Sequence, residues 1–379
     1  KTLNSTEINL PLIKISDKTI AYIFFTSGTT GTPKGVPINF GNLSGFIEAH
    51  WALDYILTNE DKCLQMFELT FDLSVVSYLA PLLKGACIYT VPKNEIKYSY
   101  IFQLMEDHKL TYALMVPSIL QYLRPYFDEI NCPSMKYSLF CGEALPLDVT
   151  EEWSKCVPNA TIANVYGPTE CTIYCTNYTY NRVGENKHHN GALTIGKDML
   201  NTSTIIVDES NNEVKLGEKG ELCLSGSQLT AGYWNNEDKN KEAFFFKKHK
   251  GKKTRFYRTG DLCSIDKDGD ILYIGRVDFQ AKIQGFRVEL SEIEFHVKET
   301  LNKINAVALA FNSSNKNLEI GLVLESETFE TKKLIDHLKS KLPSYMIPTQ
   351  IRFQNNFPLN TNGKTDRNKL KELFNLVKI

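Results

Sequence analysis

The chain has 379 residues, of which 42% are apolar and 23% charged, and its formal net charge is -1. These values describe an ordinary globular protein that is long enough for more than one domain. A net charge so near zero argues against a partner recognised by bulk charge, such as nucleic acid or an anionic membrane. No apolar stretch approaches the length of about 18 residues that a membrane-spanning helix needs.

The nine cysteines are scattered, and no Cys-x-x-Cys motif occurs. Cys171 and Cys175 form the closest pair, without histidines at the spacing of a zinc site. This usage favours free thiols in a reducing compartment and hence a cytoplasmic protein.

Residues 20–25 form an uninterrupted apolar run that is too short for a helix and is typical of a buried strand. Directly after it, residues 26–35 contain three glycines, five hydroxyl side chains and Lys34. Glycines let a backbone approach a ligand closely, and a turn of unpaired N–H groups makes a nest for anions. We interpret this segment as a polyphosphate-binding loop, with an ordinary turn of small residues as the alternative. The segment is not a Walker loop, because Gly28 is not followed by Gly-Lys-Ser/Thr at the required spacing.

Helical and strand patterns alternate through the next part of the chain. Helices are expected at residues 42–57, 100–108, 118–126 and 149–155, and strands at 85–91, 112–116 and 161–165. Such alternation predicts parallel βαβ units and therefore an α/β core.

The pattern changes twice in the second half. From about residue 195 to 277, short strands separated by turns predict a β subdomain, with examples at 203–207, 220–224 and 270–274. The basic run at 247–253 is interpreted as a solvated loop, or alternatively as a docking patch for an acidic partner. Helices at 290–301 and 332–342 around strands at 306–311 and 319–324 then predict an α+β module. We place a large domain at 1–277, α/β to about 194, and a small one at 278–379.

Residues 166–170, Tyr-Gly-Pro-Thr-Glu, follow a predicted parallel strand, and open α/β sheets bind ligands at the carboxyl ends of their strands. A tyrosine there can stack on a purine, and Glu170 can hold Mg²⁺ through oxygen. Asp261 is suited to accept hydrogen bonds from ribose hydroxyls, and Lys364 places a lone cation on a glycine-containing loop. Each of these stretches alone is also typical of a simple turn.

Together and in this order, the motifs resemble the adenylate-forming superfamily of acyl-CoA synthetases, luciferases and peptide-synthetase adenylation domains. Residues 71–74, 140–143, 278–280 and 290–296 are most similar to the D-alanine–D-alanyl carrier protein ligases, and next to peptide-synthetase adenylation domains. The resemblance runs from about residue 17 to 370. It implies a large N-terminal α/β core, a small β subdomain and a mobile C-terminal α+β domain. Such proteins carry a sizeable region before the phosphate loop, so we expect the N-terminal part of the core to be absent here.

The resemblance implies a ligase that uses ATP and Mg²⁺ to join a carboxylate to AMP and then passes the acyl group to the phosphopantetheine thiol of a carrier protein. Neither nucleic acid nor membrane insertion is implied. Lys364, Thr169 and Glu170 would be catalytic, and Glu170 would bind the metal. A hinge at Asp278 would exchange Lys364 for the loop near 285–287 between the two half-reactions. The implied nucleotide site comprises Thr26, Ser27, Gly28, Thr29, Thr30, Gly31, Lys34, Asn164, Val165, Tyr166, Gly167, Pro168, Thr169, Asp261, Tyr273, Gly275 and Arg276.

The resemblance also identifies the substrate site. Asp72 would pair with an α-ammonium group, and Lys364 would bridge the substrate carboxylate and the α-phosphate. The residues near the side chain of the substrate would be Leu73, Val76, Leu139, Cys141, Val165, Ile173 and Tyr174. None of these is charged, which predicts an uncharged side chain. Most are medium-sized and Tyr174 is large, which should leave room for little more than a methyl group. The expectation of D-alanine rests on the likeness to the ligases alone.

Two alternatives remain open at this point. One is a peptide-synthetase adenylation domain for another amino acid. The other is a non-catalytic nucleotide-binding protein, which amino-acid-dependent pyrophosphate exchange would distinguish from both enzymes.

Overall fold

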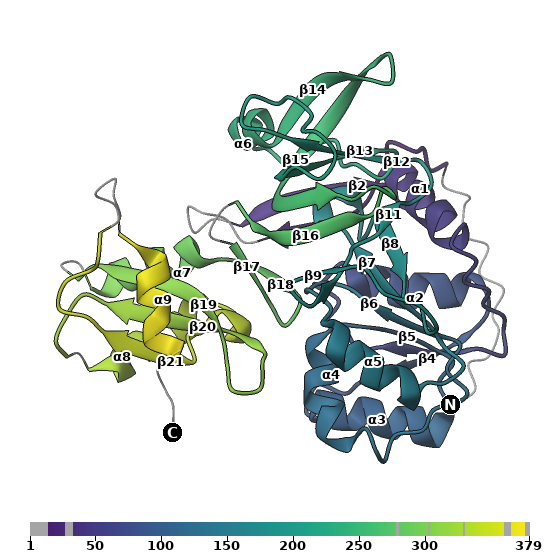
Figure 1. Ribbon diagram of the computed structural model, residues 1–379, viewed down its shortest axis with the longest axis horizontal. Helices are drawn as coiled ribbons and strands as arrows, with labels where there is room; N and C mark the ends of the chain where they lie inside the picture. The colour runs from purple at the N-terminus through teal and green to yellow at the C-terminus, as the bar shows by residue number, and fades with distance from the viewer. Residues whose placement is uncertain are drawn as a thin grey trace.

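The structure, a computed structural model, describes residues 14–26, 33–277, 280–301, 304–328, 330–359 and 365–375 (Figure 1). Within these residues the largest sheet has the strand order β11-β8-β7-β6-β5-β3-β4. The five strands from β7 to β4 are parallel, and β8 and β11 extend the sheet in antiparallel fashion. The strands are β3 (Lys62–Gln65), β4 (Cys87–Thr90), β5 (Tyr112–Met115), β6 (Tyr137–Phe140), β7 (Thr161–Tyr166), β8 (Thr176–Thr179) and β11 (Lys197–Asp198).

Helices cover both faces of this sheet. Helix α2 (Leu73–Leu83) connects β3 to β4, and the later crossovers contain α3 (Lys97–His108), α4 (Ser118–Leu123) and α5 (Leu147–Cys156). The chain reverses direction across the sheet after β4, so right-handed crossovers put α2 on one face and the other three on the opposite face. Figure 1 shows α3, α4 and α5 together on one side. The predicted α/β core is confirmed.

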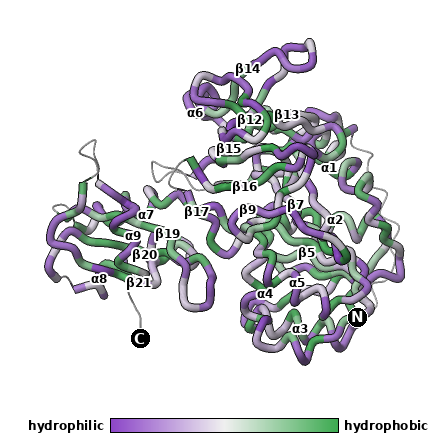
Figure 2. The backbone as a smooth tube through the Cα atoms, in the orientation of Figure 1, coloured by the Kyte–Doolittle hydropathy of each residue, from purple (hydrophilic) through white to green (hydrophobic). Residues whose placement is uncertain are grey.

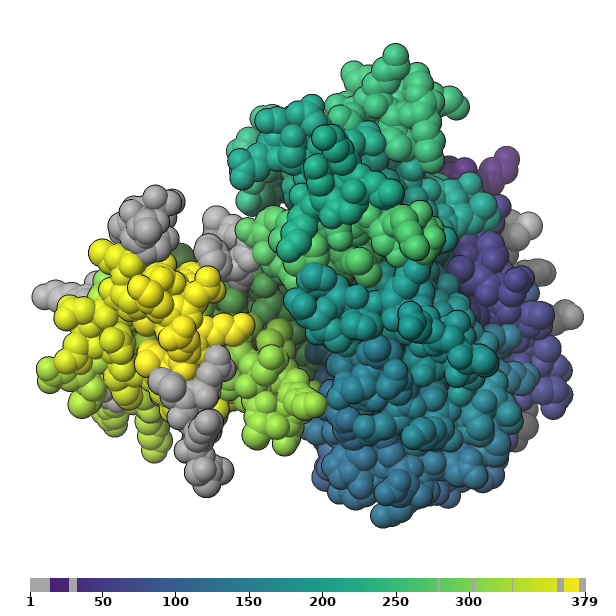
Figure 3. Space-filling view, viewed as in Figure 1, coloured from purple at the N-terminus to yellow at the C-terminus, as the bar shows by residue number. Residues whose placement is uncertain are grey.

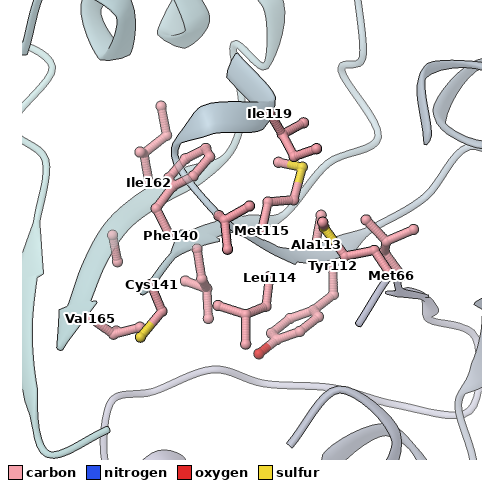
Figure 4. Close-up of a cluster of buried hydrophobic side chains, with 14 of the residues drawn as sticks. Met66, Tyr112, Ala113, Leu114, Met115, Ile119, Phe140, Cys141, Ile162 and Val165 are labelled. Carbon is pink, nitrogen blue, oxygen red and sulfur yellow. The ribbon is translucent and has the colours of Figure 1, made fainter. Parts of the chain in front are cut away.

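The central strands are buried on both faces, as parallel strands with two helical layers require. Figure 4 shows Tyr112, Leu114, Cys141 and Val165 among the apolar side chains of this core, and Figure 2 shows the apolar segments gathered inside the fold. Helix α1 (Phe40–Trp51) begins at a capping box in which Asn39 and Asn42 satisfy each other's backbone N–H groups. Its buried Phe46 and Ala49 pack on the same core.

The strand before the expected phosphate loop is predicted to be buried, but the structure shows no fully buried residue in it. Strand β1 (Ile20–Thr26) pairs only with β2 (Lys34–Asn39), in an antiparallel two-stranded ribbon outside the large sheet. One edge and part of each face of the ribbon therefore stay accessible, and Phe25 is 66% exposed.

The predicted β subdomain is present as an antiparallel sheet of β12 (Thr202–Val207), β13 (Gly220–Gly226), β14 (Phe244–His249), β15 (Lys252–Ile265) and β16 (Ile271–Arg276). Helix α6 (Glu237–Ala243) and the short pair β9 (His188–His189) and β10 (Ala192–Leu193) flank it. The basic run at 247–253 is the tip of the β14–β15 hairpin rather than a loop, because Lys247 pairs with Thr254 and His249 with Lys252.

The C-terminal part contains a hairpin and a compact module. We call β17 (Gln280–Ile283) and β18 (Phe286–Glu289) the docking hairpin. The module combines α7 (Leu290–Thr300), α8 (Thr331–Lys341) and α9 (Arg367–Asn375) with a sheet of β19 (Ala306–Asn312), β20 (Leu318–Leu324) and β21 (Gln350–Phe353).

The module lies beside the body and touches it (Figure 3). One contact is a Lys316 Nζ–Asp148 Oδ2 ion pair of 3.4 Å between the β19–β20 turn and α5. None of the described helices has both the length and the apolar character needed to cross a bilayer. All nine cysteines lie in the described part and are free thiols, as predicted.

Candidate active site

A cavity of about 140 Å³ lies where the parallel strands end. Thr70, Asp72 and Leu73 enter it after β3, Cys141 and Gly142 after β6, and Gly167, Pro168 and Thr169 after β7. Residues far apart in the chain meet there because the carboxyl ends of parallel strands share one edge of the sheet. The remaining walls are Phe24, Phe25, Thr26, Phe71, Ile173, Asp261, Arg276, Lys282, Gly285, Phe286, Arg287 and Tyr345.

Asp72 is a buried carboxylate in the wall of this cavity. It stands directly before α2, its side chain does not cap the helix, and the residue is 5% exposed. Burial raises its pKa to about 6, against the opposing effect of a hydrogen bond with Thr169. Within the described part of the chain, no lysine, arginine or histidine lies within ion-pair distance of Asp72. The site therefore contains an acidic group without an ion-pair partner, and the more distant charge of Lys282 offsets only part of the effect of burial.

Tyr166, Asp261 and Arg276 form a second polar group at the cavity. The Tyr166 hydroxyl donates to Asp261 Oδ2 at 2.5 Å, and Arg276 Nη1 donates to Asp261 Oδ1 at 2.8 Å. Burial, and next the charge of Asp261, raise the pKa of Tyr166 well above its ordinary value. The hydroxyl thus stays a donor that orients the Asp261 carboxylate at the cavity wall.

Glu170 is fully buried and is held by two partners. The Tyr233 hydroxyl donates to its Oε1 at 2.6 Å, and Arg287 Nη1 donates to both carboxylate oxygens at 3.1 Å. Burial alone would raise the pKa of Glu170, but the charges of Arg287 and Lys34 and the Tyr233 hydrogen bond outweigh it and lower the pKa. Glu170 is therefore ionised and already neutralised by a guanidinium group.

The docking hairpin enters the site beside the cavity. Its turn residues Gln284 and Gly285 both have positive φ, of 51° and 86°, and the Gly285 N–H donates to Glu143 Oε1 at 3.1 Å. Phe286 stacks on Phe71 with ring centroids 4.9 Å apart. On its other side Phe286 stacks on Tyr345 at 4.0 Å, so aromatic contacts fix the hairpin against both the body and the module.

Charged residues of the docking hairpin lie next to two residues that are expected to bind the nucleotide, Lys34 and Tyr166. Glu289 Oε1 lies 3.5 Å from Lys34 Nζ, and Lys282 Nζ lies 5.0 Å from the centroid of the Tyr166 ring. Lys34 is buried, and burial, followed by the nearby Arg287, lowers its pKa. The hairpin thus brings a carboxylate to the lysine of the expected phosphate loop.

The structure brings many of the predicted site residues together. Thr26, Asp72, Cys141, Gly167, Pro168, Thr169, Ile173, Asp261 and Arg276 line the cavity, and Leu73 does so as well. Tyr273 and Gly275 lie on β16 beside Arg276. Ser27, Gly28, Thr29, Thr30, Gly31, Asp278 and Lys364 lie outside the described residues.

Other predicted residues lie behind the wall. The Asn164 amide donates to the carbonyls of Leu193 and Thr194 at 3.3 and 2.9 Å, and Val165 is buried in the core. Tyr174 is fully buried, and its hydroxyl is 2.7 Å from His50 Nδ1 on α1. Val76 and Leu139 are core residues too, so the cavity is shaped directly by Leu73, Cys141 and Ile173 from the predicted set.

Cys141 is not set up for nucleophilic chemistry. Burial raises the pKa of its thiol to about 12, so the reactive thiolate is scarce at neutral pH. Its contribution to the site is a compact apolar surface.

Sequence reasoning missed Tyr233, Lys282, Glu289 and Tyr345, and it treated the hairpin as a loop. A signal for the hairpin is present: Ala281, Ile283 and Val288 alternate with Gln280, Lys282, Arg287 and Glu289 around a Gln-Gly turn, which is the period of a strand. Tyr233 and Tyr345 carry no comparable signal, because long-range packing alone brings them to the site.

Comparisons with known proteins identify the family of the chain. The AMP-binding enzyme family matches residues 4–234. D-alanine–D-alanyl carrier protein ligase of Bacillus licheniformis is 33% identical over 362 residues, which cover 93% of this chain and 70% of that protein. Tyrocidine synthase 3 of Brevibacillus parabrevis is 34% identical over 358 residues, 93% of this chain but 5% of that protein.

Solved structures include the Vibrio cholerae adenylation domain AlmE in complex with glycyl-adenosine-5'-phosphate. It superposes with a TM-score of 0.83 at 30% identity, covering 94% of this chain and 67% of that one.

Proposed function

Since the chain belongs to the AMP-binding enzyme family and is therefore an ATP-dependent, AMP-forming ligase, we propose that it activates a small amino acid, D-alanine, and loads it onto a carrier protein. In the first half-reaction a carboxylate oxygen of the amino acid attacks the α-phosphorus of ATP, and the bond to pyrophosphate breaks. In the second, the phosphopantetheine thiolate attacks the carbonyl carbon of the aminoacyl-adenylate, and AMP leaves.

The observation that carries the proposal is Asp72. A buried carboxylate without an ion-pair partner is costly, and the charge of Lys282 compensates it only in part, so its place in a cavity wall favours a ligand with positive charge. The α-ammonium group of an amino acid supplies that charge and leaves the carboxylate of the substrate for adenylation. An acyl or aryl acid without an amine would leave Asp72 uncompensated, which favours amino-acid activation over fatty or aromatic acid activation.

The chemistry of the cavity walls supports a small, uncharged side chain. Of the residues expected around the substrate side chain, Leu73, Cys141 and Ile173 line the cavity, and all three are apolar. A long or charged side chain would have to displace these walls or remain unpaired. D-alanine is chosen over glycine because of the similarity to the ligases, although AlmE contains a glycyl-adenylate.

For the nucleotide, we assign the ribose to Asp261 and the phosphates to Ser27, Gly28, Thr29, Thr30, Gly31 and Lys34. A Mg²⁺ ion suits the buried Glu170 carboxylate and the hydroxyl of Thr169, because this ion prefers oxygen ligands. When bound, it would neutralise phosphate charge. Lys364 would add a cation between the two reacting anions, where positioning and electrostatics supply most of the rate enhancement.

The docked hairpin fits the second half-reaction. A second cavity, of about 230 Å³, shares Phe71 and Phe286 with the first and is otherwise lined mainly by apolar residues, among them Phe67, Tyr98 and Ile119. We assign to it the pantetheine arm, whose thiol must reach the adenylate carbonyl. In this arrangement the hairpin forms part of the wall of the passage.

The test is amino-acid-dependent pyrophosphate exchange by the full-length protein, with kcat/KM measured for D-alanine, L-alanine, glycine, L-serine, L-leucine and L-phenylalanine. D-alanine should rank first. Glycine should be a poor substrate rather than an inert one, because one missing methyl group costs only about 1–3 kcal/mol. Asp72→Ala should abolish exchange, while the matched Asp238→Ala, at a side chain that is 93% exposed, should not. A preference for leucine or phenylalanine would contradict the small pocket, and exchange without any amino acid dependence would contradict the enzyme.

A second candidate, an adenylation domain of a peptide synthetase, is favoured by the 34% identity to tyrocidine synthase 3. The two differ in the carrier. Loading of a free-standing D-alanyl carrier protein supports the first, and exclusive loading of a peptidyl carrier domain supports the second.

A further inference from the structure

Two histidines and a glutamate converge on the surface of the C-terminal module. His296 and Glu299 lie on α7, and His337 lies on α8. One donor atom from each of the three residues lies within 4.8 Å of the others. Neither the nucleotide cavity nor the docking hairpin includes any of them.

The spacing of the three side chains is imposed by the fold of the module. His296 and Glu299 are three residues apart and therefore share a face of α7. Buried Ile293 and Val297 on α7 and Leu334 and Leu338 on α8 belong to one apolar core, which sets the separation of the helices. His337 thus reaches the α7 pair because the core places it there.

The distances suit a common ligand. Glu299 Oε2 lies 2.8 Å from His296 Nδ1 and 3.3 Å from His337 Nε2. Two ligands of a tetrahedral zinc ion, each bound at about 2.0–2.2 Å, are separated by about 3.3–3.6 Å. A shift of a few tenths of an ångström, within the freedom of a 39% exposed glutamate side chain, opens the shorter pair to that separation.

We propose that His296, Glu299 and His337 bind a divalent transition-metal ion, with Zn²⁺ the best match. Imidazole nitrogen and carboxylate oxygen suit zinc, and three protein ligands leave the fourth position to water. One carboxylate and two neutral imidazoles give the complex a net charge of +1. The nearby Lys341 ammonium opposes the cation and sets the affinity below that of a closed, buried zinc site.

The metal would tie α7 to α8. Helix α7 begins at Leu290, directly after Glu289 of the docking hairpin, so the ion would stiffen the support of the hairpin without touching the nucleotide site. Its role is structural, and the proposal stands whether or not the chain activates D-alanine.

The experiment uses the full-length protein, stripped with a chelator and titrated with Co²⁺ followed by Zn²⁺. We expect one equivalent of Co²⁺ to bind with the visible absorption of a tetrahedral N/O site, and Zn²⁺ to displace it. Zn²⁺ should also raise the unfolding temperature. His296→Gln and His337→Gln should each weaken binding at least about tenfold and abolish the thermal shift, with pyrophosphate exchange unchanged.

Two controls address other donors. His188→Gln and Cys87→Ser alter an exposed histidine and an exposed thiol away from the cluster, and both should bind Co²⁺ as the wild type does. Absence of a tetrahedral cobalt spectrum, an unchanged spectrum in the His296→Gln/His337→Gln double variant, or its loss in either control would overturn the proposal.

Discussion

Arg287 Nη1 donates to both carboxylate oxygens of Glu170, at 3.1 Å each, and joins the docking hairpin to the short turn that follows β7. Glu170 is the residue proposed to hold Mg²⁺, so in this arrangement a guanidinium group supplies the positive charge. Glu289 supplies the matching negative charge at Lys34, 3.5 Å away, where a phosphate is proposed to lie. Mg²⁺ and pyrophosphate, held by Glu170 and Lys34 as proposed, would compete with the docked hairpin for these two residues, so we expect pyrophosphate to leave before the hairpin docks.

Replacing Arg287 with methionine should slow thiol transfer and spare adenylation. The variant removes the ion pair of the buried Glu170 carboxylate in the docked arrangement only, at a cost of about 3–5 kcal/mol, or about 10²–10⁴ in rate. The two half-reactions are measured separately, by pyrophosphate exchange and by transfer from supplied aminoacyl-adenylate. Arg124→Met, at a surface ion pair with Asp148 and Glu152, serves as the control. Equal loss in both half-reactions would mean that Arg287 also acts in adenylation.

Gly285→Ala should have the same selectivity for a steric reason. A Cβ at this position would lie 2.5 Å from Val116 Cγ1 and 3.3 Å from Phe71, contacts that we expect to be absent in the undocked arrangement proposed for adenylation. Overpacking of this kind costs about 1–3 kcal/mol, which corresponds to a loss of thiol transfer of about 5- to 150-fold.

Gly251→Ala is a matched control for the backbone. Gly251 has a φ of 81° against 86° at Gly285, but nothing lies within 4 Å of the added Cβ. If both variants slow thiol transfer alike, the general cost of alanine at a positive φ, rather than a clash in the docked hairpin, is responsible.

The pKa of Asp72, about 6, makes substrate capture dependent on pH. Below this value the carboxyl group is protonated and no longer attracts an ammonium ion, so kcat/KM for the amino acid should fall about tenfold per pH unit. Because the folded-state pKa lies above the ordinary value of 3.8, Asp72 lowers the stability of the ligand-free protein progressively as the pH rises from 3.8 to about 6, and fully above pH 6.

Asp72→Asn should therefore raise the unfolding temperature most at pH 7.5 and distinctly less at pH 4.5, while abolishing exchange at both. The measurement is a pair of thermal unfolding curves, with Asp238→Asn as the exposed control. A variant that is less stable than the wild type at pH 7.5 would indicate that Asp72 has a cationic partner in the free protein.

Lys364 is proposed to act in adenylation alone. Lys364→Ala should lower the rate of adenylate formation by about 10²–10³, equivalent to about 3–4 kcal/mol, and leave transfer from supplied adenylate nearly intact. Lys369→Ala, at a side chain that is 61% exposed, is the control. Loss of transfer to the same extent would show that Lys364 remains in the site throughout.

The elements of the core could be predicted because their signals are local. Strong apolar runs gave β5 and β7 within one residue at each end, and apolar periodicity gave α7 and α8 equally well. The site followed from the same logic, since residues after β6 and β7 must meet at one edge of the sheet.

The predictions that were wrong concern features that depend on contacts between residues far apart in the sequence. Residues 20–25 have the composition of a buried strand, but their pairing with β2 alone leaves Phe25 66% exposed. Tyr174 neighbours Ile173 in sequence, yet its hydrogen bond to His50, 124 residues away, turns it from the cavity into the core. Periodicity describes which side of an element a residue occupies and cannot specify which distant partner it meets.

The register of the docking hairpin couples the folding of the module to the chemistry of the body. Ala281 pairs with Val288 and points into the module core, while Lys282 pairs with Arg287 on the side that faces the nucleotide site. Sliding one strand by a single residue would exchange the two faces, bury the charges and expose the apolar side chains. Packing of the apolar face of the hairpin therefore fixes the register in which its charged face is presented to the nucleotide site. A module whose core has not packed correctly would not hold Arg287 next to Glu170. Correct docking therefore depends on the hydrophobic core of the module as well as on contacts in the active site.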